Sequence, residues 1–203
     1  VQTLSNHYPR EVALMVQDGL GDENADASGF PIFDVGQRHT SRFLRLIIGN
    51  FRLWRAIRSL NPRIVHFHDP ELILLGLALK IEGKSVVYDV HEDLPKQILS
   101  KQYIKPKIIR PLLAKIAHWV EVCSSKAFDK VVVSVPTIAN RFPAEKTTVV
   151  YNYPISSIFL KLASTKKRNR PFIIHYAGAL TETRGIKNLV NAMSYLPHEF
   201  ELR

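Results

Sequence analysis

Histidines and acids lie at the end of an apolar run at Arg63–Phe67. His66 lies within the run, His68 directly follows it, and Asp69 and Glu71 come next. In open parallel sheets, ligands bind outside the carboxyl ends of the strands, and the two-residue period of a strand puts both histidines on one face. For His68 we favour contact with substrate or help in proton transfer. For His66 we favour the plainer interpretation that it flanks a helix start at Asp69.

A second polar group ends the next apolar run, Ser85–Val90. It contains Asp89, His91, Glu92 and Asp93. Because buried charges are costly unless they are paired, packing alone explains two such groups poorly. A neutral imidazole suits proton transfer or hydrogen bonding near pH 7, so His91 is the favoured catalytic or substrate-orienting residue. Glu92 is assigned to the substrate cleft, and Asp93 fits a helix N-cap equally well.

A metal site is the rival explanation of these histidines. The pattern His-x-His-Asp, with a further histidine after the next strand, offers ligands suited to zinc or to a pair of metal ions. Metal hydrolases with such a pattern use a larger barrel, however, and no third or fourth ligand set is visible in the sequence to complete the site. We therefore predict neither a metal nor another cofactor.

A third feature is the loop Gly178–Gly185, which separates an apolar run from a helical pattern. It matches neither GxxxxGK[ST] nor GxGxxG, the common nucleotide-binding patterns. Arg184 and Gly185 at a helix start still form a plausible phosphate seat, because helix N-terminal amides and a guanidinium both attract anions. The alternative is an ordinary turn in which Thr181 or Thr183 caps the helix.

The elements that must position these residues alternate along the chain. Short apolar runs rich in Val and Ile indicate strands that are buried on both faces, and helical patterns separate them. This order predicts an α/β fold with a doubly wound, Rossmann-like parallel sheet. The expected strands are Glu11–Val16, Arg63–Phe67, Ser85–Val90, Lys130–Val135, Thr147–Tyr151 and Phe172–Ala177, and the expected helices are Ser41–Leu60, Pro70–Ile81, Pro106–Phe128, Thr137–Arg141 and Gly185–Tyr195.

The 203 residues suffice for one full core and the beginning of a second. We expect a first Rossmann-like domain over residues 1–163, a polar and basic linker over 164–171, and the first βα unit of a second domain over 172–203, with a further strand beginning at Phe200. The sequence before the first expected strand is short, so we also expect that the first strand of the fold precedes residue 1.

The charge is strongly positive and unevenly distributed. The formal net charge is +10; Arg38–Arg63 holds seven arginines and no acid, and Lys101–Lys130 holds seven Lys or Arg against two acids. Such an excess usually indicates an anionic partner. Contact with an anionic membrane through Arg42, Arg45 and Arg52 is one interpretation. The other is a helix that packs its apolar stripe on the sheet. Nucleic acid is not expected, because no nucleic-acid-binding signature is present.

The sequence also bears on location. No secretory signal or membrane-spanning run is found, and the single cysteine, Cys123, can form no disulfide within the chain. We expect a cytoplasmic protein, at the inner face of the cell membrane if the arginines bind lipid.

The ordered motifs resemble family 4 glycosyltransferases with the GT-B fold, and most of all the bacterial branch that assembles surface polysaccharides. The resemblance rests on VHFHDPELILLGL, VVYDVHEDLPKQILS, FDKVVVSVPTIANRF, VVYNYP and HYAGALTETRGIKNLVNAM, which cover nearly the whole chain in the expected order. It implies a hexosyltransferase that moves a sugar from a nucleotide-sugar to a glycan or lipid-linked acceptor. Such transfer usually retains the anomeric configuration and needs no metal.

The resemblance also assigns roles to residues. His91, in the acceptor-side domain, is expected near the donor sugar and the reaction centre, and His68, Asp69 and Glu71 are expected to line the same cleft. Arg184 corresponds to the basic residue that contacts the donor diphosphate, and Gly178 marks its loop.

The sequence departs from the family pattern in three respects. Ala179 occupies a position where the family commonly has Arg, the first strand with its glycine-rich loop is absent, and the paired glutamates of the donor pocket would lie beyond Arg203. The chain alone is therefore expected to be inactive. The alternative from another class is a non-catalytic basic module that binds a membrane surface or a polyanion.

Overall fold

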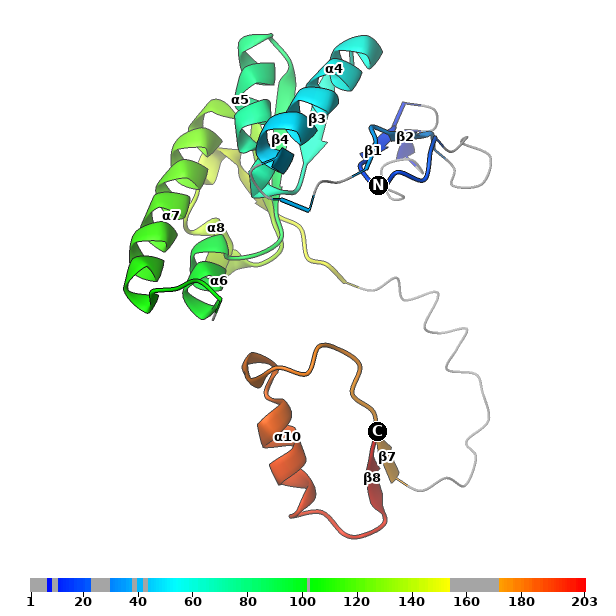
Figure 1. The fold of residues 1–203 in the computed structure, drawn as a ribbon, viewed down its shortest axis with the longest axis vertical. Helices are drawn as coiled ribbons and strands as arrows, with labels where there is room; N and C mark the ends of the chain where they lie inside the picture. Colours follow the sequence, from blue (N-terminus) through cyan, green and yellow to red (C-terminus); the bar gives the residue numbers. More distant parts are fainter. Residues whose placement is uncertain are drawn as a thin grey trace. The chain divides into compact units, whose positions relative to one another are not determined.

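The computed structural model describes residues 7–8, 11–22, 30–37, 40–41, 44–101, 103–153 and 172–203. The chain forms two compact units, Val1–Asn152 and Tyr153–Arg203, and each is described by itself. The predicted linker at residues 164–171 lies outside the described residues. Figure 1 shows the elements of both units.

A parallel sheet of four strands organises the first unit. The strands are β3 (Ile64–Phe67), β4 (Ser85–Val90), β5 (Lys130–Val133) and β6 (Thr147–Val149), hydrogen-bonded in that order. Their Val-rich sequences suit a pleated surface covered on both faces. The register pairs Phe67 with Tyr88 and Asp89 with Val132. The carboxyl ends of β3 and β4, which carry the predicted site residues, therefore lie next to each other.

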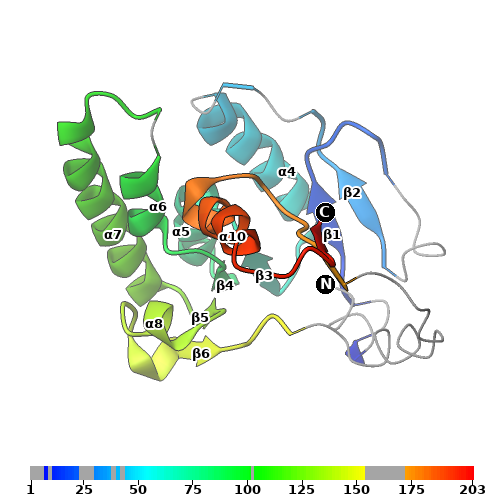
Figure 2. The same cartoon turned by 90° about the horizontal axis from the view of Figure 1, so that it is seen from below.

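Helical crossovers connect the parallel strands. After β3 come η2 (Pro70–Leu72) and α5 (Ile73–Ile81), and after β4 come α6 (Leu94–Ser100), η3 (Lys107–Ile109) and α7 (Arg110–Ala127). After β5 come α8 (Pro136–Ala139) and η4 (Ala144–Lys146). The helices α6 and α7 lie side by side in both views (Figures 1 and 2).

Earlier in the sequence, β1 (Leu14–Val16) and β2 (Ile32–Asp34) form a separate sheet of two parallel strands. It is followed by a π-helical turn, η1 (Arg45–Gly49), and by α4 (Asn50–Leu60). Leu53 and Ile57 of α4 are buried, and the helix ends at Asn61, which adopts a left-handed conformation with φ 47°. Asparagine tolerates this conformation better than most side chains.

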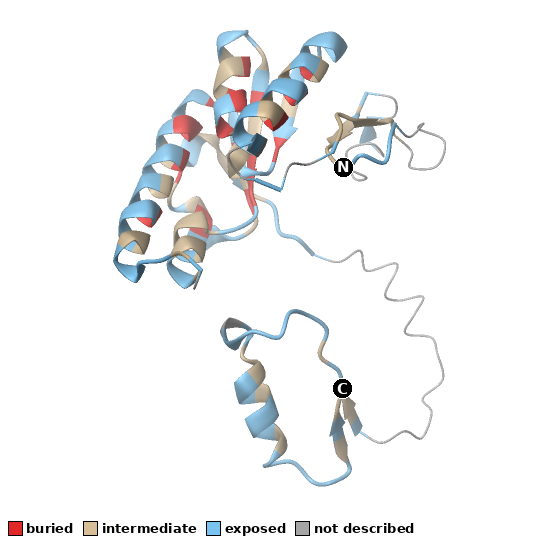
Figure 3. Ribbon diagram, in the orientation of Figure 1, coloured by how far each residue is buried: buried red, intermediate tan, exposed pale blue. Residues whose placement is uncertain are grey.

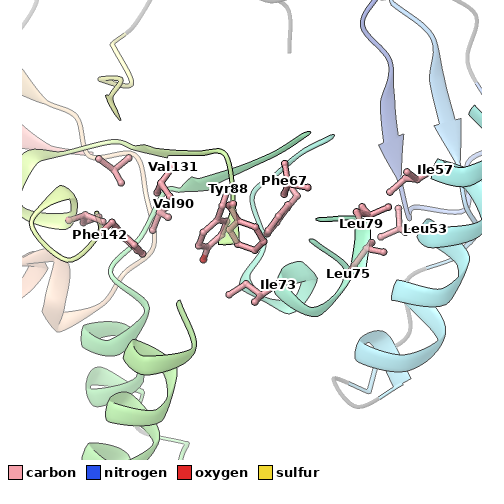
Figure 4. Close-up of a cluster of buried hydrophobic side chains, with 14 residues drawn as sticks. Leu53, Ile57, Phe67, Ile73, Leu75, Leu79, Tyr88, Val90, Val131 and Phe142 are labelled. Atoms are coloured by element: carbon pink, nitrogen blue, oxygen red, sulfur yellow. The ribbon is translucent and has the colours of Figure 1, made fainter. Parts of the chain in front are cut away.

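The core lies between β3, β4, β5 and the helices that cover them (Figure 4). The Phe67 ring stacks on Tyr88 at a centroid distance of 5.0 Å and meets the edge of Phe128 at 5.6 Å. Helix α5 approaches this aromatic group closely through Gly76, where a Cβ atom would lie 2.7 Å from the Phe67 ring. Aromatic packing thus joins the sheet to α5.

The second unit is one βα unit and a further strand. It consists of β7 (Phe172–Ile174), η5 (Glu182–Arg184), α10 (Ile186–Met193) and β8 (Phe200–Leu202), with β7 and β8 parallel. The expected strand at Phe200 is confirmed.

The structure confirms the predicted parallel α/β, Rossmann-like fold and differs from the sequence analysis in detail. β1 begins at Leu14 instead of Glu11, and β2 and α6 were not predicted. β2 has only three residues, and α6 has only seven and begins with Leu94-Pro95. Neither offers a long enough periodic pattern to be recognised. The expectation of a strand before residue 1 stays a prediction.

Candidate functional site

Three histidines surround one carboxylate at the carboxyl ends of β3 and β4. The Oδ2 atom of Asp89 lies 3.1 Å from Nε2 of His66, 3.2 Å from Nδ1 of His68 and 3.5 Å from Nε2 of His91. We call these four residues the histidine cluster. Their convergence follows from the sheet register, because β3 and β4 are neighbouring parallel strands that end at the same edge. The structure therefore brings His68 and His91 together, as the sequence predicted.

The members of the histidine cluster differ in how far they are buried. Asp89 is only 8% exposed, whereas all three histidines are exposed. The carboxylate thus lies beneath the imidazole rings, which cover it from the solvent side. Such an arrangement fixes the orientation of rings that remain accessible to a ligand.

His68 and His91 form a direct pair. Nε2 of His91 lies 2.8 Å from Nδ1 of His68, and the two ring centroids are 4.9 Å apart. A nitrogen–nitrogen hydrogen bond needs one proton between the two atoms, so one ring donates and the other accepts. The pair can therefore pass a proton between its rings. When one ring carries an extra proton, the buried carboxylate of Asp89 balances its positive charge.

The charge of Asp89 is stabilised by its neighbours. Burial by itself raises the pKa of this carboxyl, but hydrogen bonds from His66 and His68 and the charge of His91 together hold the pKa well below its usual range. Asp89 is therefore ionised throughout the neutral range and is a permanent acceptor for the histidines.

A buried network holds the loop that carries His91. The side chain of Glu121 on α7 is 1% exposed, accepts a hydrogen bond of 2.9 Å from the Tyr88 hydroxyl, and pairs with Arg141. Arg141 also donates to Asp93 at 3.2 Å. Burial, together with the negative charge of Glu121, raises the pKa of Tyr88 well above its usual range. The network connects the core to the residues just after His91.

Two further contacts fix the same loop. Asp93 is the N-cap of α6 and accepts from the Lys96 amide at 3.3 Å, so its interpretation as a cap is confirmed. The Ser134 hydroxyl, just after β5, donates to the His91 carbonyl at 3.2 Å. The backbone of His91 is thus tied to the neighbouring strand as well as to the helix that follows.

The other predicted cleft residues lie around the cluster. Asp69 precedes η2 as its N-cap residue without a side-chain cap hydrogen bond. Asn50 of α4 donates to the Glu71 carbonyl at 3.0 Å, which joins the start of α4 to η2. Glu92 is exposed beside His91. The hollow lined by Asn61 and the segment Gly83–Ser85 lies at the opposite, amino-terminal edge of β3 and β4, away from these residues.

The predicted diphosphate-binding residues belong to the second unit. Arg184 is exposed at the end of η5, and Gly185 adopts a left-handed conformation with φ 73° between η5 and α10. Gly185 is the N-cap of α10 and provides no side-chain cap, while Thr181 is the N-cap residue of the preceding η5. Nearby, the Tyr176 hydroxyl donates to the Ala179 carbonyl at 2.8 Å across Gly178.

Three residues of the histidine cluster lie close enough together to be considered as metal ligands. In the described part of the chain, one ligand atom each from His66, His68 and Asp89 lie within 4.8 Å of one another, a geometry that could hold a metal ion. Asp89 thus joins His66 and His68 in this group, a ligand combination that the sequence argument did not consider. These same atoms are also fully accounted for by hydrogen bonds and ion pairs among themselves. A site without metal stays a prediction.

Of the three arginines proposed for membrane contact, the structure describes the side chain of Arg52. Arg42 and the side chain of Arg45 lie outside the described residues, and Arg52 is exposed on α4. Within the described residues, no helix is both long and apolar enough to cross a membrane.

Comparison with known proteins identifies the family of the chain. The sequence model of glycosyltransferase family 4 matches residues 11–153, which is well over half of the chain. The chain belongs to glycosyltransferase family 4. The match covers both strands that carry the histidine cluster, together with the Tyr88–Glu121–Arg141 network.

Solved structures show the same fold. Sucrose-phosphate synthase from Thermosynechococcus elongatus is similar at a TM-score of 0.65 and 14% identity, over 97% of this chain and 52% of that one. MurG from Acinetobacter baumannii is similar at a TM-score of 0.50 and 15% identity, over 98% of this chain and 51% of that one. The family 4 chain therefore spans about half the length of these structures. A sequence comparison with the curated proteins found no match.

Sequence reasoning missed four residues of the site region. Asp89 was noticed but given no role, although the cluster is built around it, and Ser134, Glu121 and Arg141 were not considered. An acid inside the apolar run Ser85–Val90 was the one available signal, since a charge within a buried strand needs a partner. The other three act through contacts between residues far apart in sequence.

Proposed function

We propose that the protein transfers a sugar, of the hexose class, from a nucleotide-sugar donor to a glycan or lipid-linked acceptor during cell-surface polysaccharide synthesis. The observation that carries the proposal is the family 4 match over the residues that build the histidine cluster. An exposed pair of imidazoles above a buried carboxylate suits the binding of sugar hydroxyls and the movement of a proton near pH 7.

The proposed roles follow from chemistry and position. His91 hydrogen-bonds the donor sugar beside the reacting carbon, and His68 orients it through their 2.8 Å contact. Asp89 holds both rings. The developing charge on the leaving diphosphate is met by Arg184 and by the backbone amides near Gly185. Transfer is proposed to retain the anomeric configuration and to need no metal, since basic groups and amides take over the neutralisation of the diphosphate.

The proposed location is the inner face of the cell membrane, where a lipid-linked acceptor would be reached. Contact with anionic lipid through Arg42, Arg45 and Arg52 is part of this proposal. The exposed position of Arg52 on α4 supports it.

The test is donor-dependent transfer by the full-length protein. A panel of nucleotide-sugars that differ in base and in hexose is incubated with membrane lipid extract as acceptor, in buffer with and without EDTA. We expect release of a nucleoside diphosphate from at least one donor, unaffected by EDTA, and a product with the anomeric configuration of the donor in its NMR spectrum. An inverted product would refute the retaining mechanism. Absence of release from every donor would refute the transferase proposal.

A further inference from the structure

The helix α7 is amphipathic with its apolar side turned outward. Its inward positions carry small or polar residues: Ala114, Glu121, Ser124 and Ser125 are the buried ones. A helix that packs on a sheet normally places its large apolar residues inward and its polar residues outward. In α7 this order is reversed, and Figure 3 shows how much of its surface is exposed. Buried glutamate is accommodated only because Tyr88 and Arg141 pair with it.

The outward side of α7 carries large apolar residues in one continuous stripe. Leu112 is 61% exposed, Ile116 50% and Trp119 58%, and they recur at intervals of four and three residues. Leu113 and Val120, also exposed, widen the stripe by one more row. We call these five residues the outer face of α7. A contiguous apolar face of this kind marks a surface that another phase or molecule covers.

Exposed apolar residues also occur in the segment before the helix. Ile108 in η3 is 83% exposed, and Tyr103 and Leu99 are exposed as well. Because α6 and α7 lie side by side, the segment that joins them ends at the beginning of the outer face of α7.

The charged residues in and just before the first part of α7 are all basic. Five Lys or Arg and no acid occur over residues 101–115: Lys101, Lys105, Lys107, Arg110 and Lys115. Lys105, Lys107 and Lys115 are exposed. The next acid along the chain, Glu121, is buried and paired with Arg141. Exposed lysines therefore lie along the sequence on either side of the start of the outer face of α7.

We infer that the outer face of α7 docks on an anionic lipid bilayer, with the helix lying along the membrane surface. An apolar stripe bordered by lysines is the arrangement of helices that lie at the interface between headgroups and acyl chains. Tryptophan prefers the same interface. Each basic residue near an anionic surface strengthens binding by about fivefold.

The charge pattern favours a lipid surface over two alternatives, a second copy of the chain and an apolar protein partner. A second copy of the chain would bring the same face against itself around a two-fold axis, and the lysines of one copy would then meet those of the other. An apolar protein partner would gain nothing from the lysines. The inference stands on α7 alone and does not depend on sugar transfer; if transfer also holds, docking would bring the histidine cluster close to a lipid-linked acceptor.

The experiment measures binding of the full-length protein to vesicles of phosphatidylcholine with and without about 30% phosphatidylglycerol. We expect cosedimentation only with the anionic vesicles, and weaker binding at high salt. Lys105→Glu with Lys107→Glu should weaken binding by at least about 25-fold, the product of two such factors. Trp119→Gln with Ile116→Gln should weaken it by roughly tenfold or more. The matched control is Ile81→Gln, another exposed isoleucine on a helix of the same unit, which should have no effect.

A second readout locates the contact. In a variant that keeps Trp119 as its one tryptophan, with Trp54→Phe and any tryptophan outside these 203 residues also replaced by Phe, the fluorescence should shift to the blue on binding and be quenched by brominated lipid. Binding that Arg52→Glu abolishes and the α7 variants leave intact would overturn the inference in favour of α4. It would also be overturned if no anionic vesicle is bound, or if Trp119→Gln instead abolishes dimers in solution.

Discussion

Replacing Asp89 by Asn tests whether the buried carboxylate holds the histidine cluster together. The amide has nearly the same shape, so packing is preserved, but the negative charge and one acceptor oxygen are lost. Two hydrogen bonds to that charge, at 3.1 Å from His66 and 3.2 Å from His68, are weakened or broken. The orientation of His91 above them is then no longer fixed.

The expected magnitude follows from these contacts. A hydrogen bond to a charged group contributes about 1.5–3 kcal/mol and a neutral one about 0.5–1.5 kcal/mol. Both contacts reach the same oxygen, Oδ2, so an Asn oxygen at that position keeps two hydrogen bonds but only neutral ones. Burial of the charge opposes part of the gain, since Asp89 is 8% exposed. We therefore expect Asp89→Asn to lower the free energy of unfolding by about 1–3 kcal/mol at neutral pH.

The pH dependence has a definite sign. The pKa of Asp89 is lower in the folded state than the usual value, which is about 3.9 in an unfolded chain. Its contribution to stability is therefore fully present above that value and is lost as the pH falls through the folded pKa. The difference between wild type and Asp89→Asn should be largest near neutral pH and shrink in acid.

The assay is urea unfolding followed by tryptophan fluorescence between about pH 7 and pH 3. Both tryptophans, Trp54 and Trp119, belong to the first unit, so the signal reports on the unit that contains the site. Glu145→Gln, at an exposed acid in η4, is the control and should change little. A loss below about 0.5 kcal/mol at pH 7, or a loss that grows in acid, would refute the reasoning.

Three further predictions test neighbouring features. Arg141→Met should lower the free energy of unfolding by about 3–5 kcal/mol because it leaves Glu121 charged, buried and unpaired; adding Glu121→Gln should restore part of this loss in urea melts, and a double variant no more stable than the single one would contradict the pairing. Gly76→Ala should destabilise by about 1–3 kcal/mol, since its methyl group would meet the Phe67 ring at 2.7 Å; a thermal melt that instead shows the roughly 1 kcal/mol gain expected from helix propensity would contradict this packing. Added zinc followed by EDTA should leave the stability and histidine NMR signals of the protein unchanged, whereas a tight, stoichiometric shift of the His66 and His68 signals would identify a metal site.

The fold was largely predictable because the buried strands differ strongly from their surroundings. Val86, Tyr88 and Val90 of β4 are nearly inaccessible, and the short apolar run that contains them is visible in the sequence. The convergence of His68 and His91 was also predictable, because neighbouring parallel strands end at one edge of a sheet.

The remainder depended on contacts that no local pattern encodes. Asp89 is central only because three histidines from two strands meet a single oxygen, and Arg141 matters only because Glu121, twenty residues earlier, is turned inward. The reversed orientation of α7 also escaped prediction, since periodicity shows that a helix has an apolar side but not whether that side faces the core or the outside.

The role of His91 in transfer is tested most directly by the rate of His91→Ala in the full-length protein, measured as nucleoside diphosphate release with the donor that the panel identifies. The matched control is His198→Ala, at an exposed histidine in the turn before β8. The proposed role predicts a loss of about 10²–10⁴-fold in turnover for His91→Ala and wild-type turnover for His198→Ala. Wild-type turnover in His91→Ala would contradict the placement of this imidazole at the reaction centre.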